Sequence, residues 1–153
     1  MKEFRNLEQH ESEYMLTVPL LVCILIAGAD GNIDRKEIKE AIAVASRNKE
    51  SQGVLAEYFQ EVSRDFEDKL KVLIQSYPYE STQRDPMIIA ELLKINHIWP
   101  KLTRDFSSEL YQMLLELAEK VASSSGGWLG IRAVGTQEAQ YIKLPMIQDP
   151  SKN

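Results

Sequence analysis

The sequence VPLLVCILIAGADGNIDRKE, residues 18–37, decides the fold class. Its first part, 18–29, is apolar on every side of a helix, which is typical of a helix surrounded by other helices. These roughly 12 residues are well short of the ~20 that a membrane-spanning helix needs. Pro19 and Gly28 also interrupt them. We therefore expect a central buried helix over 13–28 in a soluble, all-α protein, with no membrane insertion.

The rest of the chain repeats apolar residues at helical spacing. The stripes in 54–62 and 66–77 are compatible with two helices or with one long bent helix, which Pro78 ends. The expected helices and their boundary signals are a helix capped by Asp34, the segments 54–62 and 66–77, a helix started by Asp85-Pro86 and closed by Pro100, a helix capped by Thr103 and a short helix over 137–144. We predict a compact bundle of about six or seven helices, with a weak internal repeat between 15–45 and 106–144.

We expect one domain in this chain of 153 residues, which is long enough to bury a sizeable core. The domain covers 13–148. Polar composition predicts a flexible N-terminal segment over 1–12 and a flexible tail over 149–153, since chain ends are poorly ordered unless tied down.

The composition limits the classes of molecule that this protein is expected to bind and the compartment in which it is expected to work. The net charge is −5, and basic residues are interleaved with acidic ones, so the basic footprint of a nucleic-acid binder is missing. The single cysteine, Cys23, cannot form an intrachain disulfide, which suits a reducing compartment. It lies inside VCILIA, so we expect a buried thiol and a cytoplasmic protein.

One loop motif carries more information than the composition does. Residues 29–37 read ADGNIDRKE, a D-G-x-I-D-x-x-E pattern between the central helix and the next. This pattern resembles the signature of the tellurite-resistance TerB family. The similarity extends over roughly 13–148, with a second glycine-rich turn, SGGWLG, at 125–130.

The resemblance implies a compact bundle of about seven helices and a cytoplasmic, stress-associated or regulatory domain. It implies a link to metals and no established catalytic activity. Family members of tellurite-resistance operons tend to carry a second acidic D-G loop late in the chain. Here that region is Ser-Gly-Gly-Trp and holds no carboxylate before Glu138.

Two interpretations of the first loop stay open. Asp30, Asp34 and Glu37 match the second half of a calcium-binding EF-hand loop, so they could hold a divalent cation with further oxygen ligands. Alternatively, Gly31 permits a tight turn and the carboxylates of Asp34 and Glu37 cap the following helix. The second interpretation needs no metal.

The glycine-rich segment 123–130 offers a second candidate site. Trp128 either inserts into the bundle or is exposed beside Leu129 as a contact for a protein partner. No zinc-ligand spacing and no Ser-His-Asp or Cys-His pattern is recognisable, so we expect no catalytic residues and no certain cofactor. The favoured function is a non-catalytic regulatory or interaction module with protein partners, and a homo-oligomer is compatible with the sequence. A metal sensor comes second and an unrecognised enzyme third.

Overall fold

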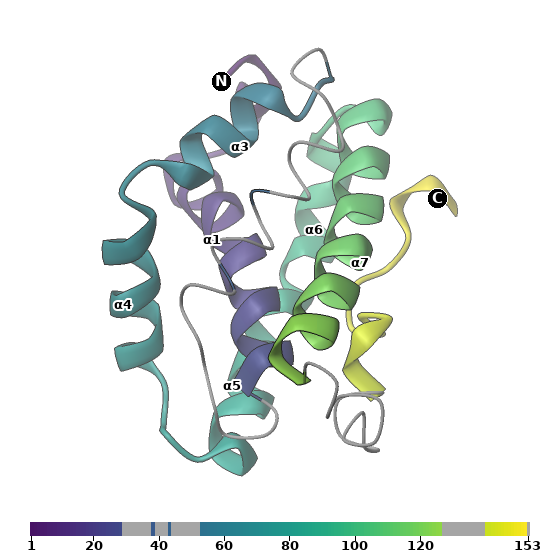
Figure 1. The fold of residues 1–153 in the computed structure, drawn as a ribbon. Coiled ribbons are helices and arrows are strands. Elements are labelled where there is room, and N and C mark those ends of the chain that lie inside the picture. Colours follow the sequence, from purple (N-terminus) through teal and green to yellow (C-terminus); the bar gives the residue numbers. More distant parts are fainter. Residues whose placement is uncertain (29–37, 39–42, 44–52, 127–139, 153) are drawn as a thin grey trace.

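The computed structural model describes residues 1–28, 38, 43, 53–126 and 140–152 (Figure 1). The described residues form α-helices, short 3-10 helices and turns, and they include no strand. The predicted all-α class is confirmed. Figure 1 shows α1 crossing the middle of the bundle between α4 and α7.

The central helix, α1, spans Gln9–Ala27. It begins earlier than predicted, because Glu8 and Glu11 form a capping box in which the Glu8 N–H donates to Glu11 Oε1 at 2.9 Å. Every residue from Val18 to Gly28 is buried, as the all-round apolar sequence predicts. Pro19 lies inside the helix without ending it.

Among the described residues, α1 is also the one helix long and apolar enough to cross a membrane. In the structure, 61% of the apolar 18-residue stretch of this helix is buried inside the bundle. Core helices of soluble proteins and N-terminal signal sequences pass the same length and composition test.

The segments 54–62 and 66–77 form two helices, α3 (Ala56–Ser63) and α4 (Phe66–Ser76). The alternative of one long bent helix is wrong. Asp65 adopts a left-handed backbone with φ 53°, and this conformation breaks the helical path between them. At the far end, Tyr77 is extended before Pro78, so the predicted stop is confirmed.

Helix α5 spans Ser81–Leu93, and the predicted start at Asp85-Pro86 is wrong. The N–H groups of Gln83 and Arg84 already donate to the Glu80 carbonyl, at 3.0 and 2.8 Å, so the first turn forms upstream. Pro86 then sits inside the helix, where it removes a single N–H donor close to the N-terminal end.

The chain continues through α6 (Ile95–Ile98) and the 3-10 helix η3 (Trp99–Lys101) into α7 (Arg104–Gly126). The predicted cap is confirmed, since Thr103 Oγ1 accepts from the Phe106 N–H at 3.2 Å. The apolar stripe of α7 is buried throughout: Phe106, Leu110, Met113, Leu114, Leu117 and Val121. This stripe forms the main contact with α1.

Both ends of the described chain pack on the bundle. Phe4, in the 3-10 helix η1 (Lys2–Phe4), is buried edge-on against Tyr58 and Phe106, with ring centroids 6.1 and 5.9 Å apart. Near the other end, the Trp99 indole N–H donates to the Gln148 carbonyl at 3.0 Å, before the 3-10 helix η5 (Pro150–Lys152). The sequence predicts flexible segments over 1–12 and 149–153, and these boundaries stay predictions.

Two predicted helices lie largely outside the described residues. Between 29 and 52 only Ile38 and Ala43 are described; both are helical, and Ile38 is fully buried. In the last predicted helix, residues 140–142 are helical, and the chain then turns at Leu144, which is buried with φ 48°. The proposed internal repeat, 15–45 with 106–144, stays a prediction.

Candidate functional site

The residues singled out from sequence fall outside the described part of the chain. These are Asp30, Asp34 and Glu37 of the D-G loop, and Trp128 and Leu129 of the glycine-rich segment. Their geometry is therefore not described. Within residues 1–28, 38, 43, 53–126 and 140–152, no three His, Cys, Asp or Glu side chains come together in a way that could hold a metal.

A buried pair of charges lies beside Gly28, at the C-terminal end of α1. Arg84 and Asp85, in the second turn of α5, are 4% and 8% exposed. Arg84 Nη2 donates to the carbonyl oxygen of Gly28, and its Nη1 donates to the carbonyl of Tyr79 at 2.9 Å. One guanidinium thus joins the end of α1 to the start of α5.

The contact favours glycine at position 28, because any larger residue would make the Arg84 guanidinium shift. A Cβ built on Gly28 would lie 2.9 Å from Cζ of Arg84, closer than real side chains approach one another. The guanidinium occupies the space that any side chain would need. Its positive charge also suits the C-terminal end of α1, where the helix dipole is negative. Gly28 precedes Asp30 by two positions, so Arg84 fixes the point from which the D-G loop departs.

The carboxylate of Asp85 is in an unfavourable environment. Burial raises its pKa above the ordinary value, and the nearby Arg84 charge opposes that rise without cancelling it. The Arg84 Nε to Asp85 Oδ1 distance is 3.7 Å, too long for a hydrogen bond, and neither atom has a hydrogen-bond partner among the described residues. The negative charge also contributes, after burial, to a raised pKa of Tyr141 on the last helical turn.

Sequence reasoning missed this pair because Asp85-Pro86 matched a helix-start pattern. A usable signal was present: Arg84, Ile88 and Leu92 are spaced four residues apart, which places Arg84 on the buried face of the same helix. A charged residue on an apolar stripe is seldom buried without partners. For Arg84 those partners are the backbone carbonyls of Gly28 and Tyr79 and the carboxylate of Asp85.

A shallow groove lies between η3, the start of α7 and η5. Its volume is about 180 Å³, and it is lined by Trp99, Pro100, Leu102, Arg104, Ser107 and Pro150. Ligand pockets usually measure about 300–1,000 Å³, so this groove is small for a substrate site. The indole N–H of Trp99, the polar group of that side chain, already donates to the Gln148 carbonyl.

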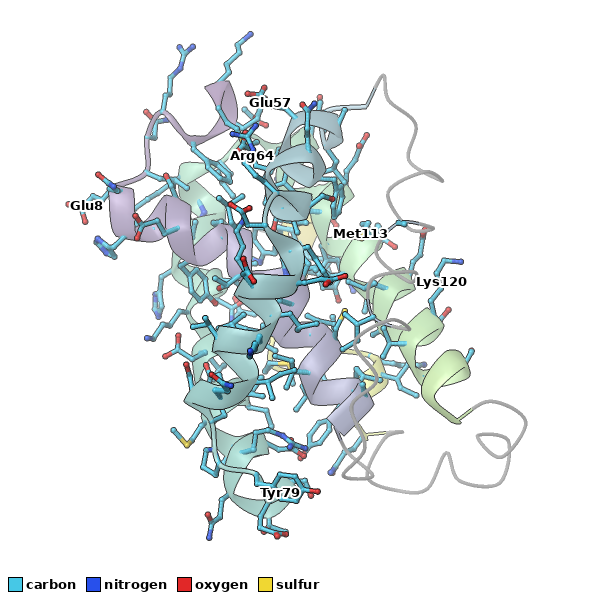
Figure 2. All side chains as sticks on the ribbon, turned by 60° about the vertical axis from the view of Figure 1, so that its left-hand side comes forward. Glu8, Glu57, Arg64, Tyr79, Met113 and Lys120 are labelled. Atoms are coloured by element: carbon cyan, nitrogen blue, oxygen red, sulfur yellow. The ribbon has the colours of Figure 1, made fainter. Side chains whose placement is uncertain are left out.

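The outer face of α5 is unusually apolar for a solvent-facing helix. Met87 and Leu93 are each 47% exposed, and Pro86 and Ala90 on the same side are also exposed. Tyr79, just before the helix, is 81% exposed and projects at one end of the molecule (Figure 2). These five residues define what we call the α5 face: Tyr79, Pro86, Met87, Ala90 and Leu93.

Comparisons with protein-family models, with curated proteins and with solved structures give no match for this chain. The resemblance to TerB proteins therefore rests on the sequence motifs alone.

Proposed function

We propose that this chain is a non-catalytic, TerB-like regulatory module that acts in the cytoplasm by binding other proteins, in a stress response of the kind that includes tellurite resistance. The observation that carries the proposal is the α5 face. Isolated exposed apolar residues are normal on proteins, whereas Pro86, Met87, Ala90 and Leu93 are exposed together on one side of a single helix, and grouped apolar residues of this kind mark interaction surfaces.

The chemistry of the α5 face suits protein binding. Tyr79 offers a large ring with a polar tip, and Met87 offers a flexible, polarisable side chain. Both residue types are enriched where proteins meet. An amphipathic segment of a partner could lay its apolar side along such a helix. The Arg84 junction beneath the face holds α5 firmly against α1.

Site-specific photo-crosslinking in living cells tests this function. A benzophenone amino acid replaces Met87 in one strain and Gln75, an exposed polar residue of α4, in another. We expect discrete crosslinked products from position 87 and none of the same mass from position 75. If position 87 yields no discrete product, or both positions yield the same one, the α5 face is not a specific binding surface.

A divalent-metal sensor is the second candidate, with Asp30, Asp34 and Glu37 as ligands. Its support is the loop sequence, and the Arg84 guanidinium, which donates to the Gly28 carbonyl two residues before Asp30, would connect such a site to α5. Calorimetric titration of chelator-stripped protein with calcium, magnesium, manganese and zinc tests this idea. Binding heat that disappears in Asp30→Ala/Asp34→Ala, while the fold is retained, would support a metal site. Equal traces for both proteins would leave the loop as a turn and helix cap.

A further inference from the structure

We propose that the α5 face binds a second copy of this chain, with the two α5 helices packed antiparallel about a two-fold axis near Met87. This inference rests on the proposed binding function of the α5 face and names the partner. It starts from the spacing of the exposed residues along the helix.

One exposed line runs the length of α5 at alternating steps of three and four residues. Its members, all exposed, are Glu80, Gln83, Met87, Ala90 and Lys94. Paired helices meet along residues spaced in this way, with apolar residues at the contact, and here the centre of the line, Met87 and Ala90, is apolar while its ends are polar. Pro86 and Leu93 flank the line and widen its apolar centre.

The charges on this line are self-complementary in one orientation only. Glu80 stands at the N-terminal end and Lys94 at the C-terminal end, and Met87 lies midway between them. An antiparallel copy centred on Met87 brings each Glu80 next to the partner's Lys94 and packs the two Met87 side chains together. A parallel copy would place Glu80 against Glu80 and Lys94 against Lys94, which is repulsive.

The ammonium group of Lys94 keeps hydrogen-bond donors beyond its contact within its own chain. Its Nζ contacts Glu91 Oε1 at 2.8 Å, while its side chain is still 60% exposed. An ammonium group has three donors, so it can hold Glu91 and also meet a carboxylate of a second chain.

Analytical ultracentrifugation of the full chain tests the proposal, at protein concentrations from about 1 µM to 1 mM. We expect a reversible dimer. Met87→Asp should weaken it by about 10-fold or more, because an unpaired charge would be buried in the seam. Val72→Asp is the matched control: Val72 is 61% exposed on α4, off the face, and its replacement should leave dimerisation unchanged.

Charge reversal tests the orientation. Glu80→Lys and Lys94→Glu should each weaken the dimer by about 3-fold or more, because each creates like-charge pairs. The double variant should recover the wild-type dissociation constant, and a mixture of the two single variants should form a heterodimer. Far-UV circular dichroism and urea unfolding confirm that every variant is folded.

The proposal is overturned by a monomer at all concentrations, by a dimer that Met87→Asp leaves intact, or by charge reversals without effect. The crosslinking experiment separates these results from failure of the proposed function. If the chain is monomeric while position 87 still captures a different protein, the α5 face binds a partner and only its identity as a second copy is wrong. If both experiments are negative, the binding function fails as well.

Discussion

Arg84 of α5 and Gly28 at the end of α1 are joined by a hydrogen bond from the guanidinium to the backbone carbonyl, 56 positions apart in the sequence. This bond is buried, and the same guanidinium also holds the Tyr79 carbonyl. The Tyr14 hydroxyl of α1 also donates to the Glu91 carbonyl of α5, so the Arg84 bond is one polar connection between the two helices. Several expectations about stability depend on it.

Replacing Arg84 by methionine should destabilise the protein strongly. The variant leaves two backbone carbonyls without their donor and Asp85 as an uncompensated buried charge, a loss of about 3–5 kcal/mol in the free energy of unfolding. Urea unfolding followed by circular dichroism measures it. Arg84→Met/Asp85→Asn is the matched control and should be more stable than Arg84→Met alone. Equal stability of the two variants would mean that Asp85 does not depend on Arg84.

The stability of the wild type relative to Asp85→Asn should depend on pH. Because burial raises the folded-state pKa of Asp85, the folded protein binds its proton more tightly than the unfolded chain. The resulting stabilisation is complete below the ordinary value of 3.8 and is lost as pH rises through the raised pKa. Urea unfolding of both proteins across this interval measures the difference. The burial argument would be contradicted if the wild type gained stability relative to Asp85→Asn as the pH rises.

Gly28→Ala should cost about 1–3 kcal/mol, because its new methyl group overlaps the Arg84 guanidinium and something must move. Helix propensity alone would favour alanine over glycine in a helical backbone, so the predicted sign is opposite to that of a simple propensity argument. The same substitution in an Arg84→Met background should cost less, since the shorter, uncharged side chain leaves room. An additive double mutant would show that the two sites do not interact.

Phe4→Ala should destabilise the protein by about 3 kcal/mol, although the sequence places Phe4 in a flexible segment. The ring is 8% exposed and packs against Tyr58 and Phe106. Thermal unfolding of Phe4→Ala and Phe4→Leu separates ring packing from general apolar burial, and leucine should restore part of the loss. Wild-type stability of the alanine variant would place the first residues outside the cooperative fold.

The Cys23 thiol should be inert in the native protein. It is fully buried, and burial raises its pKa, so little thiolate forms and no reagent reaches it. Ellman's reagent should therefore label it only through opening of the fold, at a rate that rises with urea. In concentrated urea the reaction should reach one thiol per chain. Rapid labelling of the native protein would show that α1 is not sealed inside the bundle.

The helical architecture follows from the sequence because periodicity records burial directly. The stripe on α7 and the all-round apolar α1 are predicted and found. The break at Asp65 was left open, because a left-handed aspartate depends on the packing of the helices around it. The start of α5 was misplaced, since a local capping pattern cannot show that an upstream turn is stabilised by tertiary contacts.

The candidate functional residues could be predicted from the sequence less well than the fold. Motif reasoning pointed to Asp30, Asp34, Glu37, Trp128 and Leu129, which lie outside the described residues. The Arg84–Asp85 junction and the α5 face come from three-dimensional relationships that local spacing does not contain. A buried arginine needs distant carbonyls, and exposure of Met87 depends on which side of α5 faces α1.

The burial of α1 by later segments has a consequence for synthesis. The most apolar helix of the described chain is made before its main partner, α7, which starts about 80 residues further on; at roughly 5–20 residues per second that interval lasts several seconds. During this time the apolar surface of α1 that packs on α7 is not yet covered by that helix. Until α7 is synthesised, α1 lacks its main packing partner, so the core of the described bundle is completed late in synthesis.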